Sequence, residues 1–127
     1  MIVDSVLSQE RRRKTVLIVE DDMAISEAIS LAVSHEGYTT AVAADGTQAL
    51  ELLGKLKVDL ILTDLAMKPM PGKELLARLE KDPALRTIPV IVISGEVDIQ
   101  AIADGRKPIQ KPFRRVELLK AVEDALR

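Results

Sequence analysis

The sequence predicts an α/β fold in which an open, five-stranded parallel sheet is covered by helices on both faces. Short runs of β-branched residues alternate along the chain with stretches in which apolar residues recur at helical spacing. The runs Leu60–Leu62 and Val90–Ile93 are apolar without interruption. Strands of this composition are buried on both sides, as in parallel sheets whose crossovers are helices.

The first half of the chain contains two strand–helix units and a third strand. Strands are predicted at residues 15–19, 39–44 and 58–63, and helices at residues 24–36 and 47–55. The strands are rich in Val, Ile, Leu and Thr, and the helices have apolar residues three or four positions apart. Gly37 ends the first helical pattern, because glycine commonly follows a helix.

The second half continues the alternation with a shorter crossover. Helices are predicted at residues 72–81, 97–103 and 114–126, and strands at residues 88–93 and 107–110. Asp82 and Pro83 end the first of these helices. The helix at 97–103 would span only about 10 Å, and 16 residues in all separate Ser94 from Lys111. We therefore expect the fourth helix to be short or irregular.

Composition limits the possible functions of this 127-residue chain. Its length fits one domain, which we place at residues 15–127, after a flexible N-terminal arm at residues 1–14. The net charge of −2 and an aromatic content of 2% disfavour nucleic-acid binding. Without cysteines, a secretory signal or an apolar run of membrane-spanning length, we expect a cytoplasmic protein that does not bind a membrane.

Charged and polar side chains follow the predicted strands. Acidic residues 20–22 follow the first strand, Asp64 the third, Ser94 the fourth and Lys111 the fifth. The carboxyl ends of parallel strands meet at one edge of a sheet, where ligands bind. Carboxylates without histidine or cysteine partners suit Mg²⁺. Asp64 could then accept a phosphoryl group, whose oxygens Lys111 and Ser94 would hold.

Five segments in order give the chain a specific resemblance to the response-regulator receiver family of two-component signalling, of the stand-alone type. They are Val16–Asp22, Asp59–Leu65, Gly72, Pro89–Gly95 and Lys111–Phe113. The resemblance covers about residues 15–127. It implies the flavodoxin-like strand order 2-1-3-4-5. That order puts the fifth strand at an edge, where Pro108 is tolerated.

The resemblance also implies a metal site and a phosphoacceptor. By position, Glu20 and Asp21 resemble the family's acidic pair, with Asp21 the more direct Mg²⁺ ligand. Asp64 resembles the phosphorylated aspartate and a second ligand, and the backbone carbonyl of Ala66 resembles the third. Asp22 is expected only to cap the following helix.

Two further positions match the residues that complete the family's site. Ser94 corresponds to the switch serine or threonine, and Lys111 to the invariant lysine, whose peptide bond to Pro112 is expected to be cis. His35 is expected to be a surface residue and not a phosphotransfer histidine.

The chain departs from the family pattern in three places. Lys68 stands where the family usually has proline, the crossover after Ser94 is short, and Pro108 replaces the aromatic switch residue. The usual coupling of serine to an aromatic residue therefore cannot operate in its ordinary form. Ala66 is small, so water should reach a phosphoryl group on Asp64 and shorten its lifetime.

These features predict a Mg²⁺-dependent, phosphorylation-controlled signalling switch. It is not expected to be an enzyme, and it would catalyse only its own phosphoryl transfer and dephosphorylation. Its expected partners are a sensor histidine kinase or histidine phosphotransfer protein, and an unknown effector protein. The alternative is a receiver-fold scaffold that is never phosphorylated. An aspartate-nucleophile phosphatase is disfavoured because Ala66 occupies the place of a second acid. A nucleotide-binding protein is disfavoured because no glycine-rich phosphate loop follows the first strand.

Overall fold

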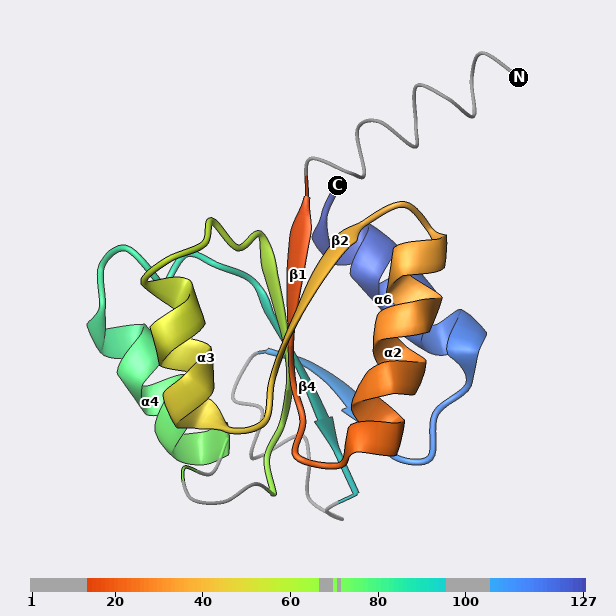
Figure 1. The fold of residues 1–127 in the computed structure, drawn as a ribbon, viewed down its shortest axis with the longest axis horizontal. Coiled ribbons are helices and arrows are strands. Elements are labelled where there is room, and N and C mark those ends of the chain that lie inside the picture. Colours follow the sequence, from red (N-terminus) through yellow and green to blue (C-terminus); the bar gives the residue numbers. More distant parts are fainter. Residues whose placement is uncertain (1–13, 67–69, 71, 96–105) are drawn as a thin grey trace.

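The predicted sheet is present in a computed structural model of the protein, which describes residues 14–66, 70, 72–95 and 106–127 (Figure 1). The strands are β1 (Thr15–Val19), β2 (Thr39–Ala43), β3 (Leu60–Asp64), β4 (Val90–Ser94) and β5 (Lys107–Gln110). The helices are α2 (Met23–His35), α3 (Gly46–Leu53), α4 (Gly72–Lys81) and α6 (Arg115–Ala125). From β1 to β4, strands and helices thus alternate as the sequence predicts.

The strand order is β2-β1-β3-β4-β5, and every neighbouring pair is parallel. This confirms the predicted fold class and topology. β5 lies at one edge, with Pro108 in register with Val92 of β4. An edge position tolerates the missing N–H of a proline, because only one side of the strand is paired.

The core consists of two apolar layers, one on each face of the sheet. Leu17 and Val19 of β1 belong to the layer beneath α3 and α4, whereas Val16 and Ile18 belong to the layer beneath α2 and α6. Figure 1 shows the sheet edge-on between these two pairs of helices. Because successive side chains of a strand point to opposite faces, burial on both faces requires the continuous apolar runs seen in the sequence.

The bounds of three strands differ from the prediction. β2 ends at Ala43 and not at residue 44. β3 starts at Leu60 and not at residue 58, and it extends through Asp64. β4 starts at Val90 and not at residue 88, because the Ile88 N–H donates to the carbonyl of Leu85 and closes a turn there. Apolar composition alone could not show where this turn ends.

Two predictions fall on segments outside the described residues: the helix at 97–103 and the flexible arm up to residue 13. Lys14, the last residue of the predicted arm, is exposed. Among the residues that the structure describes, no helix is both long and apolar enough to cross a membrane.

Replacement of Leu118 should test the layer beneath α2 and α6. Leu118 is 1% exposed in α6, whereas Val116 of the same helix is 76% exposed. We expect Leu118→Ala to lower the free energy of unfolding by about 2–5 kcal/mol, because it leaves a cavity. Val116→Ala should change it by less than about 0.5 kcal/mol. Urea unfolding followed by far-ultraviolet circular dichroism would measure both values, and equal effects would contradict this packing.

Candidate functional site

Three carboxylates gather where β1 and β3 end, at the lower edge of the sheet in Figure 1. Glu20 and Asp21 directly follow β1, and Asp64 is the last residue of β3. One oxygen of each lies within 4.8 Å of the others. Glu20 and Asp64 are buried, whereas Asp21 is exposed. The parallel pairing of β1 with β3 brings together acids that are more than forty positions apart in the sequence.

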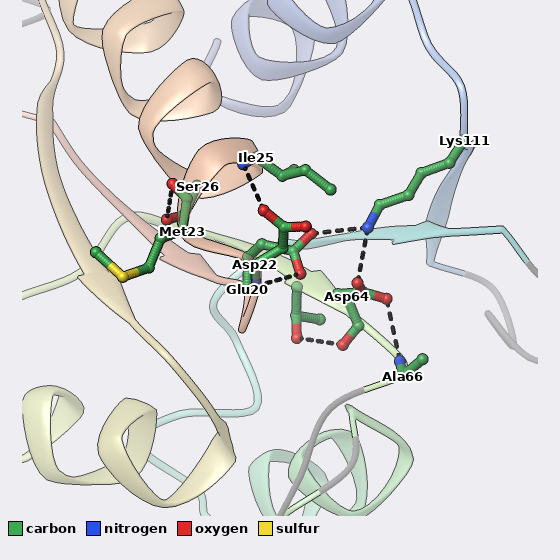
Figure 2. Close-up of polar contacts among 9 residues, drawn as sticks. Glu20, Asp22, Met23, Ile25, Ser26, Asp64, Ala66 and Lys111 are labelled. Carbon is green, nitrogen blue, oxygen red and sulfur yellow. Dashed lines mark hydrogen bonds and ion pairs between the residues drawn. The ribbon is translucent and has the colours of Figure 1, made fainter.

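Lys111 bridges two of these acids (Figure 2). Its Nζ donates to Oε1 of Glu20 at 2.7 Å and to Oδ2 of Asp64 at 2.8 Å. β5 ends directly before Lys111, and the Lys111 N–H donates to the carbonyl oxygen of Ser94 at 2.8 Å. The ladder between β4 and β5 is thus continued through Lys111, which aims its side chain at the acids.

Backbone N–H groups orient both buried carboxylates. The Ala66 N–H donates to Oδ1 of Asp64 at 3.0 Å, and the Asp22 N–H donates to Oε2 of Glu20 at 3.3 Å. Both contacts are drawn in Figure 2. The Asp22 side chain accepts from the Ile25 N–H and caps α2, as predicted. Each buried acid is therefore held at both oxygens, by Lys111 on one side and by an amide on the other.

Burial and pairing act in opposite directions on this cluster. Burial, together with the nearby charge of Asp64, raises the pKa of Glu20 although Lys111 lowers it. Burial by itself lowers the pKa of Lys111, but its hydrogen bonds to Asp64 and Glu20 outweigh that effect and raise it. Lys111 therefore remains protonated at neutral pH, and its positive charge offsets part of the negative charge of Glu20 and Asp64.

The remaining predicted residues lie around this cluster. Ser94 is fully buried at the end of β4, next to Ile93, which is in register with Asp64. Ala66 is exposed two residues beyond Asp64. The bond between Lys111 and Pro112 is cis, as the resemblance implied. His35 is exposed at the end of α2, in agreement with its assignment to the surface.

The acidic cluster suits a hard divalent cation. Glu20, Asp21 and Asp64 offer only oxygen ligands, and the exposed side chain of Asp21 leaves the cluster open to solvent. Carboxylates that leave room for water are the ligands that Mg²⁺ prefers. The residues present therefore fit a divalent metal site, with Lys111 as a second cationic group at its rim.

The sequence did not indicate that Lys111 pairs with Glu20 as well as with Asp64. It placed all three at one edge, but several acids follow β1 and any of them could have been the partner. Burial determines that Glu20 is the partner of Lys111, because its side chain is 3% exposed and needs a cation, whereas Asp21 is solvated.

A parallel sheet of order 2-1-3-4-5 with three acids and a lysine at its carboxyl edge defines the class of CheY-like receiver folds. The family model of the response regulator receiver domain matches residues 16–123. The chain therefore belongs to the response-regulator receiver family.

Known proteins similar to this chain agree with that assignment. The DNA-binding response regulator MtrA of Mycobacterium tuberculosis (strain ATCC 25618 / H37Rv) is 32% identical over 120 residues, which cover 91% of this chain and 51% of MtrA. The chain thus spans about half the length of this relative. The signal receiver domain of a histidine kinase from Syntrophus aciditrophicus has a TM-score of 0.83 and 32% identity, with 89% of each chain covered. The chemotaxis response regulator CheY4 of Vibrio cholerae has a TM-score of 0.80 and 28% identity, covering 89% of this chain and 98% of CheY4.

Removal of the ammonium should make stability depend more strongly on pH. In Lys111→Met, Glu20 would face Asp64 without a cation beside it, which raises the folded-state pKa of Glu20 further. A raised carboxyl pKa costs stability when the group is ionised, and this cost disappears as pH falls through the folded-state pKa. We expect Lys111→Met to be more destabilising at pH 7 than at pH 5. Urea unfolding in EDTA would measure this, with Lys120→Met, an exposed lysine of α6, as the control.

Proposed function

We propose that this receiver domain, which we place at residues 15–127, is a signalling switch phosphorylated on Asp64 in a Mg²⁺-dependent reaction. The observation that carries the proposal is the placement of Asp64. It is buried at a strand end, it belongs to a three-carboxylate cluster, and Lys111 contacts it at 2.8 Å. A carboxylate in this setting can attack phosphorus, because the surrounding cations offset the added negative charge.

Each residue of the site has a distinct part in this proposal. An oxygen of Asp64 forms a bond to phosphorus as the bond from phosphorus to the donor breaks, and the donor retains the bonding electron pair. Glu20, Asp21, Asp64 and the Ala66 carbonyl would hold Mg²⁺, which supplies charge neutralisation when bound. Lys111 would pair with a phosphoryl oxygen. Ser94, buried on the neighbouring strand, would donate its hydroxyl hydrogen to another.

The proposed chemistry is limited to the domain's own phosphorylation and dephosphorylation. The phosphoryl donor would be a sensor histidine kinase or a histidine phosphotransfer protein, and output would pass through contacts with an effector protein. Membership of the receiver family supports these partners. MtrA is a DNA-binding regulator by name, but the chain covers only half of MtrA, so DNA binding is not part of this proposal.

Phosphoryl uptake is the direct test of this function. The protein is incubated with acetyl phosphate with and without Mg²⁺ and weighed by intact-protein mass spectrometry. We expect a phosphoryl adduct that requires Mg²⁺ and is absent in Asp64→Asn. Asp59→Asn is the matched control and should still load. Asp59 directly precedes β3, at the end opposite Asp64, where it accepts from the Thr15 N–H.

The other outcomes separate the proposal from its alternative. An adduct that persists in Asp64→Asn would contradict Asp64 as the acceptor. If no adduct forms and BeF₃⁻ with Mg²⁺ also fails to bind, the receiver-fold scaffold without phosphorylation is the better account. If BeF₃⁻ binds although no adduct accumulates, dephosphorylation is faster than uptake.

Ala66 should influence how long the phosphoryl group lasts. Its side chain is small and exposed, and its N–H contacts Asp64 directly, so it leaves a path for water to the acceptor. We expect Ala66→Arg to slow dephosphorylation by about tenfold, equal to about 1.4 kcal/mol in the barrier. Loss of the adduct after removal of acetyl phosphate would give the rate. Ala84→Arg, at an exposed position near the amino ends of the strands, should dephosphorylate like the original protein.

A further inference from the structure

Met70 lies in the connection that follows the proposed phosphoacceptor. It comes six positions after Asp64, and its side chain is 8% exposed in the apolar layer beneath α3 and α4. Leu65, directly after Asp64, belongs to the same layer and is 3% exposed. Leu65, directly before the exposed Ala66, and Met70, four positions after it, are thus both buried in the core.

Met70 fills a space that exists because residue 46 is glycine. A Cβ atom on Gly46 would lie 2.6 Å from Sδ and 2.7 Å from Cγ of Met70, closer than real Cβ contacts. The Gly46 N–H also donates to the carbonyl oxygen of Met70 at 3.4 Å. Both the side chain and the backbone of Met70 thus contact the first residue of α3.

The connection between β2 and α3 joins this contact to the other side of the site. At one end of this connection, the carbonyl of Ala43 accepts from the Glu20 N–H at 3.0 Å. At its other end Gly46 contacts Met70, and Asp45 between them caps α3. The segment 43–46 therefore contacts the backbone of Glu20 through Ala43, and the backbone of Met70 through Gly46.

We infer that Met70 is a positioning residue for the chemistry at Asp64. Its packing against Gly46 holds residue 70, four positions after Ala66, and would thereby limit where Ala66 can lie. The N–H of Ala66 orients the Asp64 carboxylate. This inference rests on the proposed function, since the chemistry in question is phosphoryl transfer. A side chain at position 46 would displace Met70 and, through it, Ala66. Displacements of about 1 Å at a catalytic group can lower rates about a hundredfold.

The test compares alanine at the two ends of one helix. We expect Gly46→Ala to slow phosphoryl uptake from acetyl phosphate with Mg²⁺ by about ten- to a hundredfold. The matched control is Gly54→Ala, at the C-terminal end of α3, where a Cβ would lie 3.4 Å from the nearest atom. This control should load at the original rate. All rates are measured well below the thermal midpoint of each variant, so that only folded protein is compared.

A second substitution distinguishes positioning from a merely structural contact. In Gly46→Ala combined with Met70→Ala the two atoms that would lie 2.6 and 2.7 Å from the new Cβ are gone, and a contact of 3.0 Å with the Cβ at position 70 remains. Uptake should therefore be several-fold faster than in Gly46→Ala alone. A merely structural contact would lower the thermal midpoint and leave the uptake rate of folded protein unchanged. That result, or an absence of rescue in the double variant, would overturn the inference.

Amide hydrogen exchange tests the inference separately from the proposed function. Gly46→Ala should accelerate exchange of the Ala66 amide, which donates to Asp64, by more than about tenfold, because local contacts protect it. Exchange at Val92 in the middle of β4 should be unchanged. If the original protein forms no adduct and also fails to bind BeF₃⁻ with Mg²⁺, the proposed function fails and this measurement alone decides whether Met70 positions Ala66. Unchanged exchange of the Ala66 amide in Gly46→Ala would overturn the inference that Met70 positions Ala66.

Discussion

The ion pairs of Lys111 with Glu20 and Asp64 are the interaction on which the arrangement of the site depends. The two carboxylates have side chains that are only 3% and 8% exposed, and such groups are costly to keep ionised without a cation. Lys111 contacts them across 91 and 47 positions of sequence. This is possible only if the ends of β1, β3 and β5 lie at the same level, so the sheet must be parallel and in register.

The sheet meets this requirement because its strands are buried on both faces. Apolar layers above and below β1, β3 and β4 fix the strands laterally, and the parallel ladders fix their ends. Within β1, β3 and β4 the one charged residue is Asp64, the last residue of β3, and Glu20 and Asp21 directly follow β1. There, backbone N–H groups from Asp22 and Ala66 hold the acids in place. The apolar core and the charged edge are thus two consequences of one pattern, in which an apolar run ends in an acid.

Among the described residues, the departure from the usual receiver pattern is Pro108, which lies in β5 in register with Val92 of β4. Pro108 occupies an edge strand that needs no second hydrogen-bonding partner, so the fold accommodates it without change. The resemblance to the family implies that other receivers use an aromatic side chain at this position in switching, and Pro108 offers none. Lys111 already pairs with both buried acids, so phosphorylation of Asp64 would redistribute contacts of Lys111.

The sequence by itself determined the fold class, the order of elements and the set of residues at the sheet edge. Periodicity and composition suffice for these, because burial on two faces demands uninterrupted apolar runs and the polar residues that follow them must meet at one edge. Only the tertiary structure decided that β3 includes Asp64, that β4 begins after the turn at Ile88, and that Lys111 selects Glu20 over the solvated Asp21. It also decided that Met70 occupies the space beside Gly46. The inclusion of Asp64 in β3, the pairing of Lys111 and the packing of Met70 depend on which atoms meet across distant segments, and such contacts follow from packing in three dimensions, which local sequence patterns do not encode. The start of β4 depends on the hydrogen bond from the Ile88 N–H to Leu85, which an apolar run does not reveal.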